Sequence, residues 1–460
     1  MTKKTFKNLE MNLSDFALST DLYELTMAAA YFKSGQIKKR AIFELFVRKL
    51  PRNRSYMVAA GLEQAVAYLQ SLRFVEKEIS FLKSHESLKN LDNDFFEYLK
   101  DFRFTGDVWA VLEGTILFPN EPLLRVEGPI IEAQVVETFL LSVINFQSLI
   151  ATKTSRITHV ASNKDVIEFG SRRAHGPQAA LLAARASFIG GCVGSSNTLA
   201  GYKFGIPIFG TMAHSYVMSY DKEIDSFQEF TQVFPRSMIL VDTYDTLEAV
   251  RKIVEAGIKI SGIRLDSGDL YQLSVESRKI LDMGGYKDAK IMASGDLNEN
   301  IIQDLVSRDA PIDYFGVGTE LTTSRDDPAM NGVYKLVAIK IPRSKKKYQL
   351  IYKLKTSEGK KTYPGPKQIF RIFSNGLIER DIIGLEDEKL QVKAVPLLKK
   401  FMEHGRLIRK LPCLDTIQKF HIKQRDILPI EFKALDKVPE VFPVSYSDKL
   451  EKIEKEFRTE

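Results

Sequence analysis

Polar side chains follow a series of short apolar runs in the middle of the sequence, at the point where each run ends. The runs DVIEFG, IPIFG, SMILVD, KISGIRLD, AKIMASG and YFGVG alternate with helix-like segments, a pattern that predicts parallel strands. The polar groups are, run by run, Glu168, Arg172 and Arg173; Thr211 and His214; Asp242 and Asp245; Arg264, Asp266, Ser267, Gly268 and Asp269; Ser294, Gly295 and Asp296; and Gly316, Gly318 and Thr319. Because the carboxyl ends of parallel strands meet at one face, we expect a single site there.

These residue types favour a phosphorylated, anionic ligand. The glycine-rich turns SGDL, which occurs twice, and GVGTEL expose backbone N–H groups that bind phosphate oxygens. Arg172 or Arg264 would bind a carboxylate or a phosphate with two parallel N–H groups, and either is equally compatible with an ion pair at a strand end. The carboxylates of Asp242, Asp266 and Asp296 are compatible with binding Mg²⁺, holding a ribose hydroxyl or orienting a histidine.

His214 lies in the stretch GTMAHSYVMSY, just past the predicted strand IPIFG. A neutral imidazole is a nucleophile at the ring nitrogen that carries no proton, and a carboxylate at the other nitrogen would fix that tautomer. Asp242 and Asp266 are the candidates for this orienting role. For any single histidine the alternative is a surface or packing residue, so the prediction depends on the neighbouring polar groups.

Three regions must position these residues. Residues 1–148 mix helix-like and strand-like segments, beginning with TDLYELTMAAAYF and RAIFELFVRKL. Residues 149–333 contain the alternating runs and predict an α/β sheet or barrel. Residues 334–460 return to strands and end in a charged helical segment, DKLEKIEKEF. We therefore expect a catalytic α/β domain flanked by two segments of mixed structure.

Composition predicts a soluble, cytoplasmic protein of two or three domains. The chain has 460 residues, 44% of them hydrophobic and 27% charged, which is an ordinary globular balance. Its two cysteines, Cys192 and Cys413, are far apart and form neither a disulfide framework nor a zinc motif. We expect no signal peptide and no membrane partner, because the N-terminal lysines precede no apolar stretch and the uncharged run at 204–220 is interrupted.

Positive charge is concentrated in the last third of the sequence. The net charge is +7, and the segment from Lys335 onward carries 29 basic against 17 acidic residues. Such asymmetry is compatible with nucleic acid, an anionic surface or a phosphate-rich small substrate. No basic and aromatic RNA-binding module is visible, so we expect no nucleic-acid partner; a non-catalytic phosphate- or nucleic-acid-binding protein is the alternative from another class.

Six motifs in order along the chain give it a resemblance to the nicotinate phosphoribosyltransferase family. They are TDLYELTM, EFGSRRAHGPQAA, GSSNTLAGYKFGIPIFGTMAHSYVMSY, IRLDSGDL, FGVGTEL with GVYKL, and KTSEGKKTYPGPKQIFR. The resemblance implies an irregular TIM-like parallel α/β barrel in the middle region and an open-faced α/β sandwich domain built from the N- and C-terminal segments. It implies the joining of nicotinate to phosphoribosyl pyrophosphate for NAD salvage, coupled to ATP hydrolysis through a phosphorylated His214.

The resemblance also implies roles for individual residues. Arg264 and Thr211 would hold the nicotinate carboxylate, and Phe169 or Tyr23 would stack on the pyridine ring. In the family the segment that contains Tyr23 reaches the neighbouring subunit's site, which implies a homodimer. The remaining candidates, for the phosphates, the ribose and Mg²⁺, are Arg172, Ser294, Gly295, Asp296, Gly318 and Thr319, and no metal-ligand set is predicted. Lys353, Lys355 and Lys367 lie in the last motif, where both ATP contact and support of the fold are open.

Two relatives are alternatives within the same class. A nicotinamide phosphoribosyltransferase would share the strand-end Arg264 and Asp266, but EFGSRRAHG and GTMAHS favour the acid substrate. Quinolinate phosphoribosyltransferases share a similar fold but are usually much shorter and use no phosphohistidine. The stretch MILVDTYDT lacks the second acid and the Thr-Gly pair of type I phosphoribosyltransferases, so we reject that fold.

Overall fold

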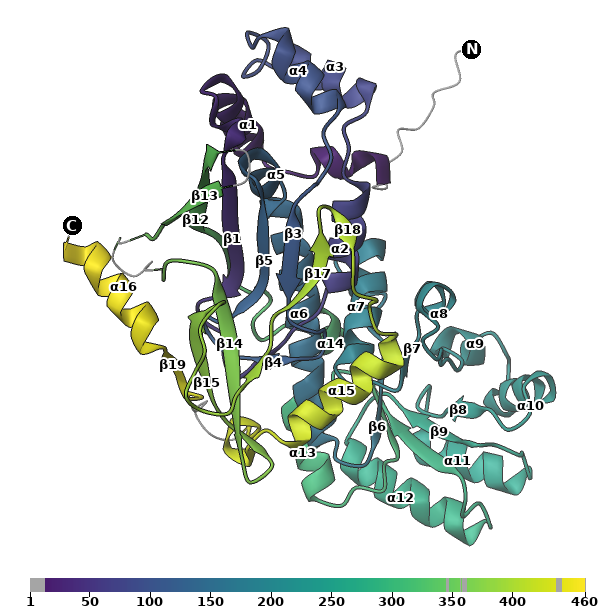
Figure 1. Ribbon diagram of the computed structural model, residues 1–460. Coiled ribbons are helices and arrows are strands. Elements are labelled where there is room, and N and C mark those ends of the chain that lie inside the picture. Colours follow the sequence, from purple (N-terminus) through teal and green to yellow (C-terminus); the bar gives the residue numbers. More distant parts are fainter. Residues whose placement is uncertain (1–12, 345–346, 356, 358–361, 436–440, 460) are drawn as a thin grey trace, which may run out of the picture.

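The computed structural model describes residues 13–344, 347–355, 357, 362–435 and 441–459. A seven-stranded antiparallel sheet forms one half of the molecule (Figure 1). Its strands, in spatial order, are β13 (Lys347–Tyr352), β12 (Gly332–Ser344), β1 (Arg40–Val47), β5 (Pro122–Pro129), β3 (Asp107–Ala110), β17 (Lys399–Glu403) and β18 (Arg406–Leu407). Strands from both ends of the chain therefore build one sheet, since β1 pairs with β12 and β3 pairs with β17.

Helices and smaller sheets complete this half. The helices are α1 (Leu22–Lys33), α2 (Leu62–Ser71), α3 (Glu76–Ser84), α4 (Asn93–Lys100) and α5 (Ile130–Val135). A four-stranded sheet contains β16 (Val395–Pro396), β14 (Lys367–Ser374), β15 (Leu377–Leu385) and β19 (Val444–Tyr446), and a two-stranded one β2 (Met57–Val58) and β4 (Ile116–Leu117). The chain ends in α16 (Asp448–Thr459), which contacts β15.

The second half contains a six-stranded sheet in which every pairing is parallel. Its order is β7 (Gly194–Ser195), β6 (Asp165–Glu168), β11 (Tyr314–Val317), β10 (Lys290–Ala293), β9 (Gly262–Leu265) and β8 (Met238–Leu240). Helices alternate with the strands: α7 (Pro177–Ile189), α8 (Thr198–Phe204), α9 (His214–Met218), α10 (Glu223–Val233), α11 (Thr246–Glu255), α12 (Leu270–Met283), α13 (Glu299–Ser307) and α14 (Thr319–Thr323). This is the irregular α/β barrel of the predicted fold class, and the sheet-based half is its sandwich domain.

One predicted strand is much shorter than expected. The run IPIFG forms only an isolated bridge between Ile208 and Ser195. Pro207 has no N–H to donate to a neighbouring strand, which limits how far pairing can extend there. Thr211 and His214 nevertheless follow this bridge, on the same side as the other strand ends.

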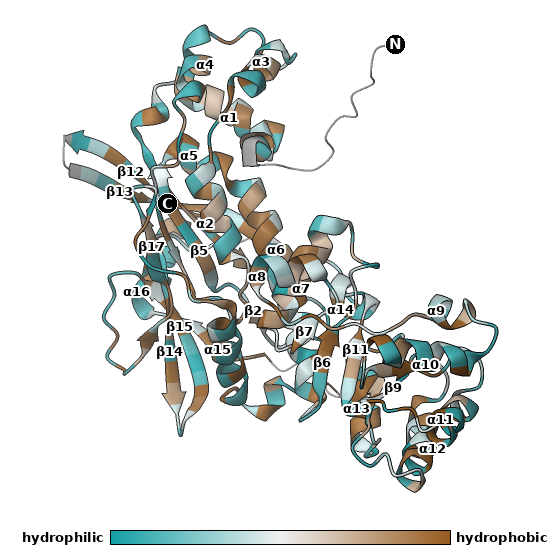
Figure 2. Ribbon diagram, turned by 90° about the vertical axis from the view of Figure 1, so that its right-hand side faces the viewer, coloured by the Kyte–Doolittle hydropathy of each residue, from teal (hydrophilic) through white to brown (hydrophobic). Residues whose placement is uncertain are grey.

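Helix α6 (Glu137–Val160) connects the two halves. Phe139, Leu140 and Leu149 belong to the hydrophobic core of the antiparallel half, whereas Ile150 and Ile157 belong to that of the barrel. The predicted division at residues 148 and 149 falls inside this helix. By length and composition alone Ile130–Val160 could cross a membrane, but 67% of its most apolar window is buried inside the protein. Figure 2 shows α6 as a largely apolar segment between the two halves.

Helix α15 (Leu414–Asp426) brings the C-terminal segment onto the barrel, where it packs against α7. Its His421 is completely buried, with Nδ1 3.1 Å from the Gly114 carbonyl oxygen and Nε2 2.8 Å from Ser155 Oγ. Nδ1 must donate to the carbonyl, so Nε2 accepts the Ser155 proton and the ring is neutral. Burial lowers the pKa of His421 to about 3. The packing of α15 thus involves an uncharged, buried histidine.

Candidate functional site

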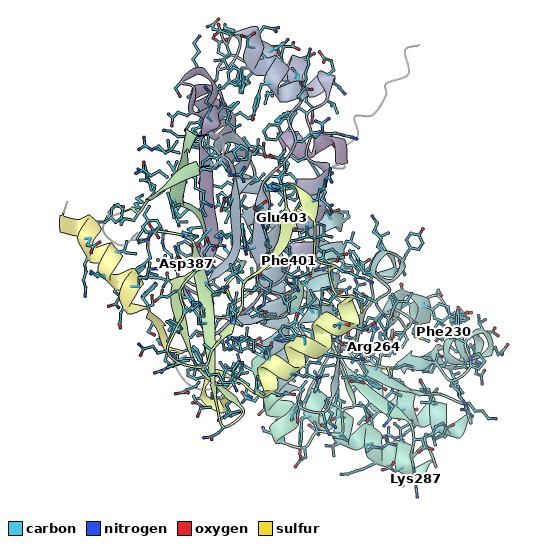
Figure 3. The ribbon with its side chains drawn as sticks, viewed as in Figure 1. Phe230, Arg264, Lys287, Asp387, Phe401 and Glu403 are labelled. Atoms are coloured by element: carbon cyan, nitrogen blue, oxygen red, sulfur yellow. The ribbon has the colours of Figure 1, made fainter. Side chains whose placement is uncertain are left out.

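Arg264 lies in β9, and its guanidinium is near Thr211, which follows the bridge at Ile208, and Asp266, which follows β9. Nη1 donates to Thr211 Oγ1 at 2.9 Å, and Nη2 lies 3.9 Å from Asp266 Oδ1. Nε is buried and has no hydrogen-bond partner among the described residues. Burial and the charge of Arg172 lower the pKa of Arg264, while Asp266 and Asp242 oppose this shift. Arg264, labelled in Figure 3, therefore carries a buried donor that a ligand oxygen could satisfy.

Asp266 connects Arg264 with His214. His214 is the first residue of α9, and its Nε2 lies 4.0 Å from Asp266 Oδ2. The other carboxylate oxygen of Asp266 accepts a hydrogen bond from Ser294 Oγ. The second ring nitrogen of His214, Nδ1, lies 3.1 Å from Thr243 Oγ1. The side chain of His214 is 41% exposed, so its reactive edge is accessible.

Asp242 supports the turn after β9. One of its carboxylate oxygens accepts the Asp266 N–H at 3.0 Å and the Ser267 hydroxyl at 2.6 Å. The other oxygen is buried without a partner among the described residues. The two predicted candidates for orienting His214 thus differ in position: Asp266 faces the ring, and Asp242 binds the Asp266–Ser267 backbone and hydroxyl. Thr243, directly after Asp242, is the residue in hydrogen-bond distance of Nδ1.

Phe169 lies over Gly316, a residue of β11. A Cβ atom added to Gly316 would lie 2.6 Å from the Phe169 ring and 3.2 Å from Ser294 Cβ. Only glycine therefore leaves room for the ring at this position. Gly318, the N-cap of α14, lies next to the Phe169 backbone, where an added Cβ would be at an ordinary contact distance of 3.5 Å from the carbonyl oxygen, and Thr319 is the next residue. The aromatic ring and the predicted phosphate-binding turn are thus neighbours.

Gly295 forms the tight turn after β10. Its φ is +105°, and an added Cβ would lie 2.4 Å from the Asp266 carbonyl oxygen. Both the left-handed backbone and the close approach require glycine. Asp296, the next residue, lines a cleft of about 540 Å³ together with Asp266 and Ser294. The cleft extends outward between α12 and α13, where its other walls are Ser267, Gly268, Asp269, Leu270, Tyr271, Leu297, Ile301, Asp304, Leu305 and Arg308.

Glu168 anchors the loop that carries Phe169 and Arg172. Its carboxyl group is completely buried and accepts hydrogen bonds from the Gly170 N–H and from Ser195 Oγ. Burial raises the pKa of Glu168. Arg172 itself is exposed on this loop, and its charge acts on Arg264. The sequence therefore predicted that the residues after these strands lie on one side of the sheet, but it did not indicate that Ser195 binds Glu168.

Tyr23 is the one predicted site residue that the single chain keeps apart from the others. It lies on α1 and is 47% exposed. Figures 1 and 2 both show α1 at the opposite end of the molecule from β8–β11. The Tyr23 hydroxyl interacts with Glu137, and burial together with this carboxylate raises the pKa of Tyr23. Of the two aromatic residues predicted to stack on the ligand, Phe169 is therefore the one that lies near the strand ends within one chain.

Two further expectations concern cations. Lys367 is buried, and its ammonium group bonds to Glu44 Oε2 at 2.7 Å and to the Tyr363 and Gly365 carbonyl oxygens. It supports the fold, because two hydrogen bonds to backbone carbonyl oxygens and the ion pair with Glu44 hold the ammonium group inside the protein. No cluster of three or more His, Cys, Asp or Glu side chains suited to a metal ion occurs in the described parts of the chain. A cation at this site would therefore need oxygens from the substrate as well.

Comparison with known proteins agrees with this geometry. Residues 18–145 and 390–454 match the nicotinate phosphoribosyltransferase N-terminal and C-terminal domains, and residues 150–326 match the quinolinate phosphoribosyl transferase C-terminal domain. A nicotinate phosphoribosyltransferase of Mycobacterium tuberculosis is 44% identical over 441 residues, covering 94% of this chain and 92% of the relative. This chain belongs to the nicotinate phosphoribosyltransferase family. The predicted resemblance is thereby confirmed.

Two more members of the nicotinate phosphoribosyltransferase family extend the comparison. The Bacillus subtilis enzyme is 40% identical over 472 residues, covering 96% of this chain and 95% of its own. The crystal structure of human nicotinic acid phosphoribosyltransferase superposes with a TM-score of 0.82 at 28% identity, covering 95% of this chain and 99% of that one. All predicted site residues except Tyr23 lie within the matched range 150–326, and Tyr23 lies within the matched N-terminal domain.

Proposed function

We propose that this chain joins nicotinate to phosphoribosyl pyrophosphate, giving nicotinate mononucleotide and pyrophosphate in NAD biosynthesis. The pyridine nitrogen attacks C1 of the ribose, and the bond from C1 to the pyrophosphate oxygen breaks. The observation that carries this proposal is the buried Arg264 guanidinium, which has an unpaired Nε and the Thr211 hydroxyl beside it. A carboxylate bound there would be held by charge-assisted hydrogen bonds, and Phe169 is in position to contact an aromatic ring.

The phosphoribosyl group belongs at the two glycine turns. Backbone N–H groups around Gly295 and Gly318, with the Thr319 hydroxyl, are the donors for its phosphate oxygens. Mg²⁺ fits this arrangement only as an ion shared with the substrate, because Asp242 has an unpaired buried oxygen and Asp266 and Asp296 line the cleft without forming a metal cage. When bound, the ion would neutralise the leaving pyrophosphate.

We further propose that ATP hydrolysis is coupled to this step through His214. With Nδ1–H donated to Thr243 Oγ1, the Nε2 lone pair is available to attack the γ-phosphorus of ATP, and ADP leaves. Water later cleaves the phosphohistidine to release inorganic phosphate. Asp266, 4.0 Å from Nε2, stabilises the imidazolium that forms before the proton is lost.

A homodimer with shared sites completes the proposal, together with a cytoplasmic location. Leu22 and Tyr23 on α1 are 42% and 47% exposed, which leaves an apolar surface for a second copy. In such a dimer, Tyr23 of each copy contributes to the other copy's nicotinate site. The alternative of a nucleic-acid-binding protein has no comparable support, because the described basic residues of the C-terminal segment include buried, paired ones such as Lys367.

The test is formation of nicotinate mononucleotide from nicotinate, phosphoribosyl pyrophosphate and Mg²⁺, with and without ATP. Nicotinamide and quinolinate are offered in parallel. Product from nicotinate, with an ATP stimulation that disappears in His214→Ala, is the expected result. A preference for nicotinamide would assign the other substrate, and stimulation that persists in His214→Ala would exclude the phosphohistidine. No product from any of the three bases would reject the proposal.

A further inference from the structure

A cluster of six ionised side chains adjoins the two glycine turns but does not belong to them. Its cations are Arg54, Lys153 and Arg156, and its anions are Glu299, Glu320 and Asp326. At its edge, Glu320 also pairs with the exposed Arg325, at 3.5 Å. The side chain of Lys153 is 1% exposed and that of Glu299 is 4% exposed, so the centre of the cluster is removed from water.

Lys153 is at the centre of this cluster. Its ammonium nitrogen lies 2.5 Å from Glu299 Oε2, 2.9 Å from Asp326 Oδ1 and 3.9 Å from Glu320 Oε2. The three carboxylates come from three places: the start of α13, the start of α14, and the loop that follows α14. One buried cation on α6 therefore links three segments that are separate in sequence.

Two of these segments are direct continuations of the turns proposed to bind phosphoribosyl pyrophosphate. Glu299 begins α13, shortly after Ser294, Gly295 and Asp296. Glu320 immediately follows Thr319 in α14. The strands that precede the turns, β10 and β11, are neighbours in the sheet. Lys153 thus contacts the start of the helix that follows each turn, while the sheet fixes the strand that precedes it.

The two turns need such an attachment for a physical reason. Helix α14 has five residues, too few for a helix to be stable by itself. Backbone N–H groups bind phosphate well only when their directions are fixed before the ligand arrives. A buried ionic cluster contributes little net stability compared with apolar packing, so its value lies in the geometry that it imposes.

Arg54 and Arg156, the other two cations of the cluster, pair with Asp326 and Glu299. Arg54 donates to both carboxylate oxygens of Asp326, at 2.6 and 3.0 Å, and Arg156 Nε lies 3.4 Å from Glu299 Oε1. Asp326 has a lowered pKa because of its hydrogen bonds to Arg54 and Lys153, and Lys153 is the main cause of the lowered pKa of Glu299. Glu320 pairs with the exposed Arg325 at 3.5 Å and lies 3.9 Å from Lys153, so Lys153 is the buried cation that faces the start of α14.

We propose that Lys153 is a positioning residue for phosphoribosyl pyrophosphate, holding the turns 294–296 and 318–319 at the spacing that the phosphates require without touching the substrate. The inference rests on the proposed function, because that function supplies the ligand. The structural claim, that Lys153 fixes the position of both turns, can be tested without measuring enzyme activity.

The first test is hydrogen exchange on the full-length protein. In Lys153→Met, which keeps the length of the side chain and removes its charge, amides of 294–299 and 318–323 should exchange at least tenfold faster, with α12 unchanged. The milder variant Glu320→Gln should loosen 318–323 alone. Unchanged exchange at both turns in Lys153→Met would overturn the proposal, whether or not the native protein forms nicotinate mononucleotide.

The second test separates positioning from general stability. In Lys153→Met the KM for phosphoribosyl pyrophosphate should rise at least tenfold, while the KM for nicotinate changes less than twofold. The charge-balanced variant Lys153→Met with Glu299→Gln should recover thermal stability but keep the raised KM. Arg371→Met, which removes the cation of a buried pair with Asp381 in β14 and β15, is the matched control and should lower the melting temperature with both KM values unchanged.

Each outcome has a distinct meaning. Two results would overturn the inference: equal changes of both KM values in Lys153→Met, or a native KM for phosphoribosyl pyrophosphate in the charge-balanced variant. Either would show that Lys153 only stabilises the folded protein. Absence of product and of phosphoribosyl pyrophosphate binding in the native protein would instead reject the proposed function. The exchange measurement then still decides whether Lys153 fixes the turns.

Discussion

Thr243 Oγ1 lies 3.1 Å from Nδ1 of His214, on the opposite side of the imidazole from Asp266. A hydroxyl can donate or accept, so this contact orients the imidazole, and in the proposed mechanism it accepts the Nδ1 proton. Thr243→Val keeps the shape and removes this contact, so the ratio of rates with and without ATP should fall three- to tenfold, as expected for one hydrogen bond of about 1 kcal/mol. Thr246→Val, three residues further on, is the control and should keep the native ratio. An unchanged ratio in Thr243→Val would show that the tautomer is set in another way.

Arg264 should determine the choice between the acid and the amide substrate. Arg264→Gln replaces a charge-assisted contact with a neutral one, so kcat/KM for nicotinate should fall about 10- to 100-fold, equivalent to about 1.5–3 kcal/mol. The kcat/KM for nicotinamide should fall much less, because the amide group of nicotinamide carries no charge. Parallel kinetics with both substrates measure the ratio. An equal loss for the two would mean that Arg264 organises Thr211 and Asp266 rather than the carboxylate.

Gly295→Ala should abolish binding of phosphoribosyl pyrophosphate. The new methyl group would lie 2.4 Å from the Asp266 carbonyl oxygen, at a φ of +105°. Gly257→Ala is the matched control, since Gly257 also has a positive φ, +64°, but an added Cβ would meet nothing within 4 Å. Both variants should lose stability, by about 1 kcal/mol for the backbone conformation alone. Only Gly295→Ala should lose binding in calorimetry; equal affinities would contradict the proposed turn.

His421 should make the protein sensitive to acid. Its folded pKa of about 3 lies below the ordinary value of 6.5, so the unfolded chain binds a proton that the folded protein excludes between these pH values. The stability contribution is complete above pH 6.5 and is lost as the pH falls toward 3, by about 1.4 kcal/mol per pH unit. In His421→Asn the urea unfolding free energy should fall less steeply over this range. The same slope in both proteins would exclude His421 as a cause.

Subunit complementation should reveal a shared site. Tyr23→Ala and Arg264→Ala should each be poorly active alone, since one removes the contribution of α1 and the other that of the barrel. Mixed after mild denaturation and refolding, they should recover up to about a quarter of the native activity, because half of the dimers are hybrids and each hybrid has one intact site. No recovery, with a monomer measured by ultracentrifugation, would contradict the proposed dimer.

The sequence predicted the strand ends well for a clear reason. Parallel strands of this kind are short, apolar and followed by glycine or aspartate, so β6, β8, β9, β10 and β11 were each recognisable by local pattern. The residues that follow them, Arg264, Asp266, Ser294 and Gly295, are brought together by the topology alone. The run IPIFG was apolar in the same way but forms a single bridge, because pairing depends on neighbours that the local pattern does not contain.

Contacts between distant segments could not be predicted in this way. Thr243 was visible in LVDTYDT, yet only the structure shows that its hydroxyl reaches His214 rather than the solvent. Lys153 occupies a largely apolar helix, where a lysine gives no sign that three carboxylates converge on it. The position of Tyr23 relative to the barrel likewise depends on how the antiparallel half packs. These are properties of the tertiary arrangement.

The continuity of α6 restricts how the molecule can move. One helix supplies side chains to both hydrophobic cores, so a hinge between the halves would require breaking backbone hydrogen bonds in a buried helix. Opening and closing around substrate is therefore expected of the loops that follow the strands, not of a rotation of one half against the other. For the same reason, neither half can melt while the other stays native, and heating should give one cooperative transition.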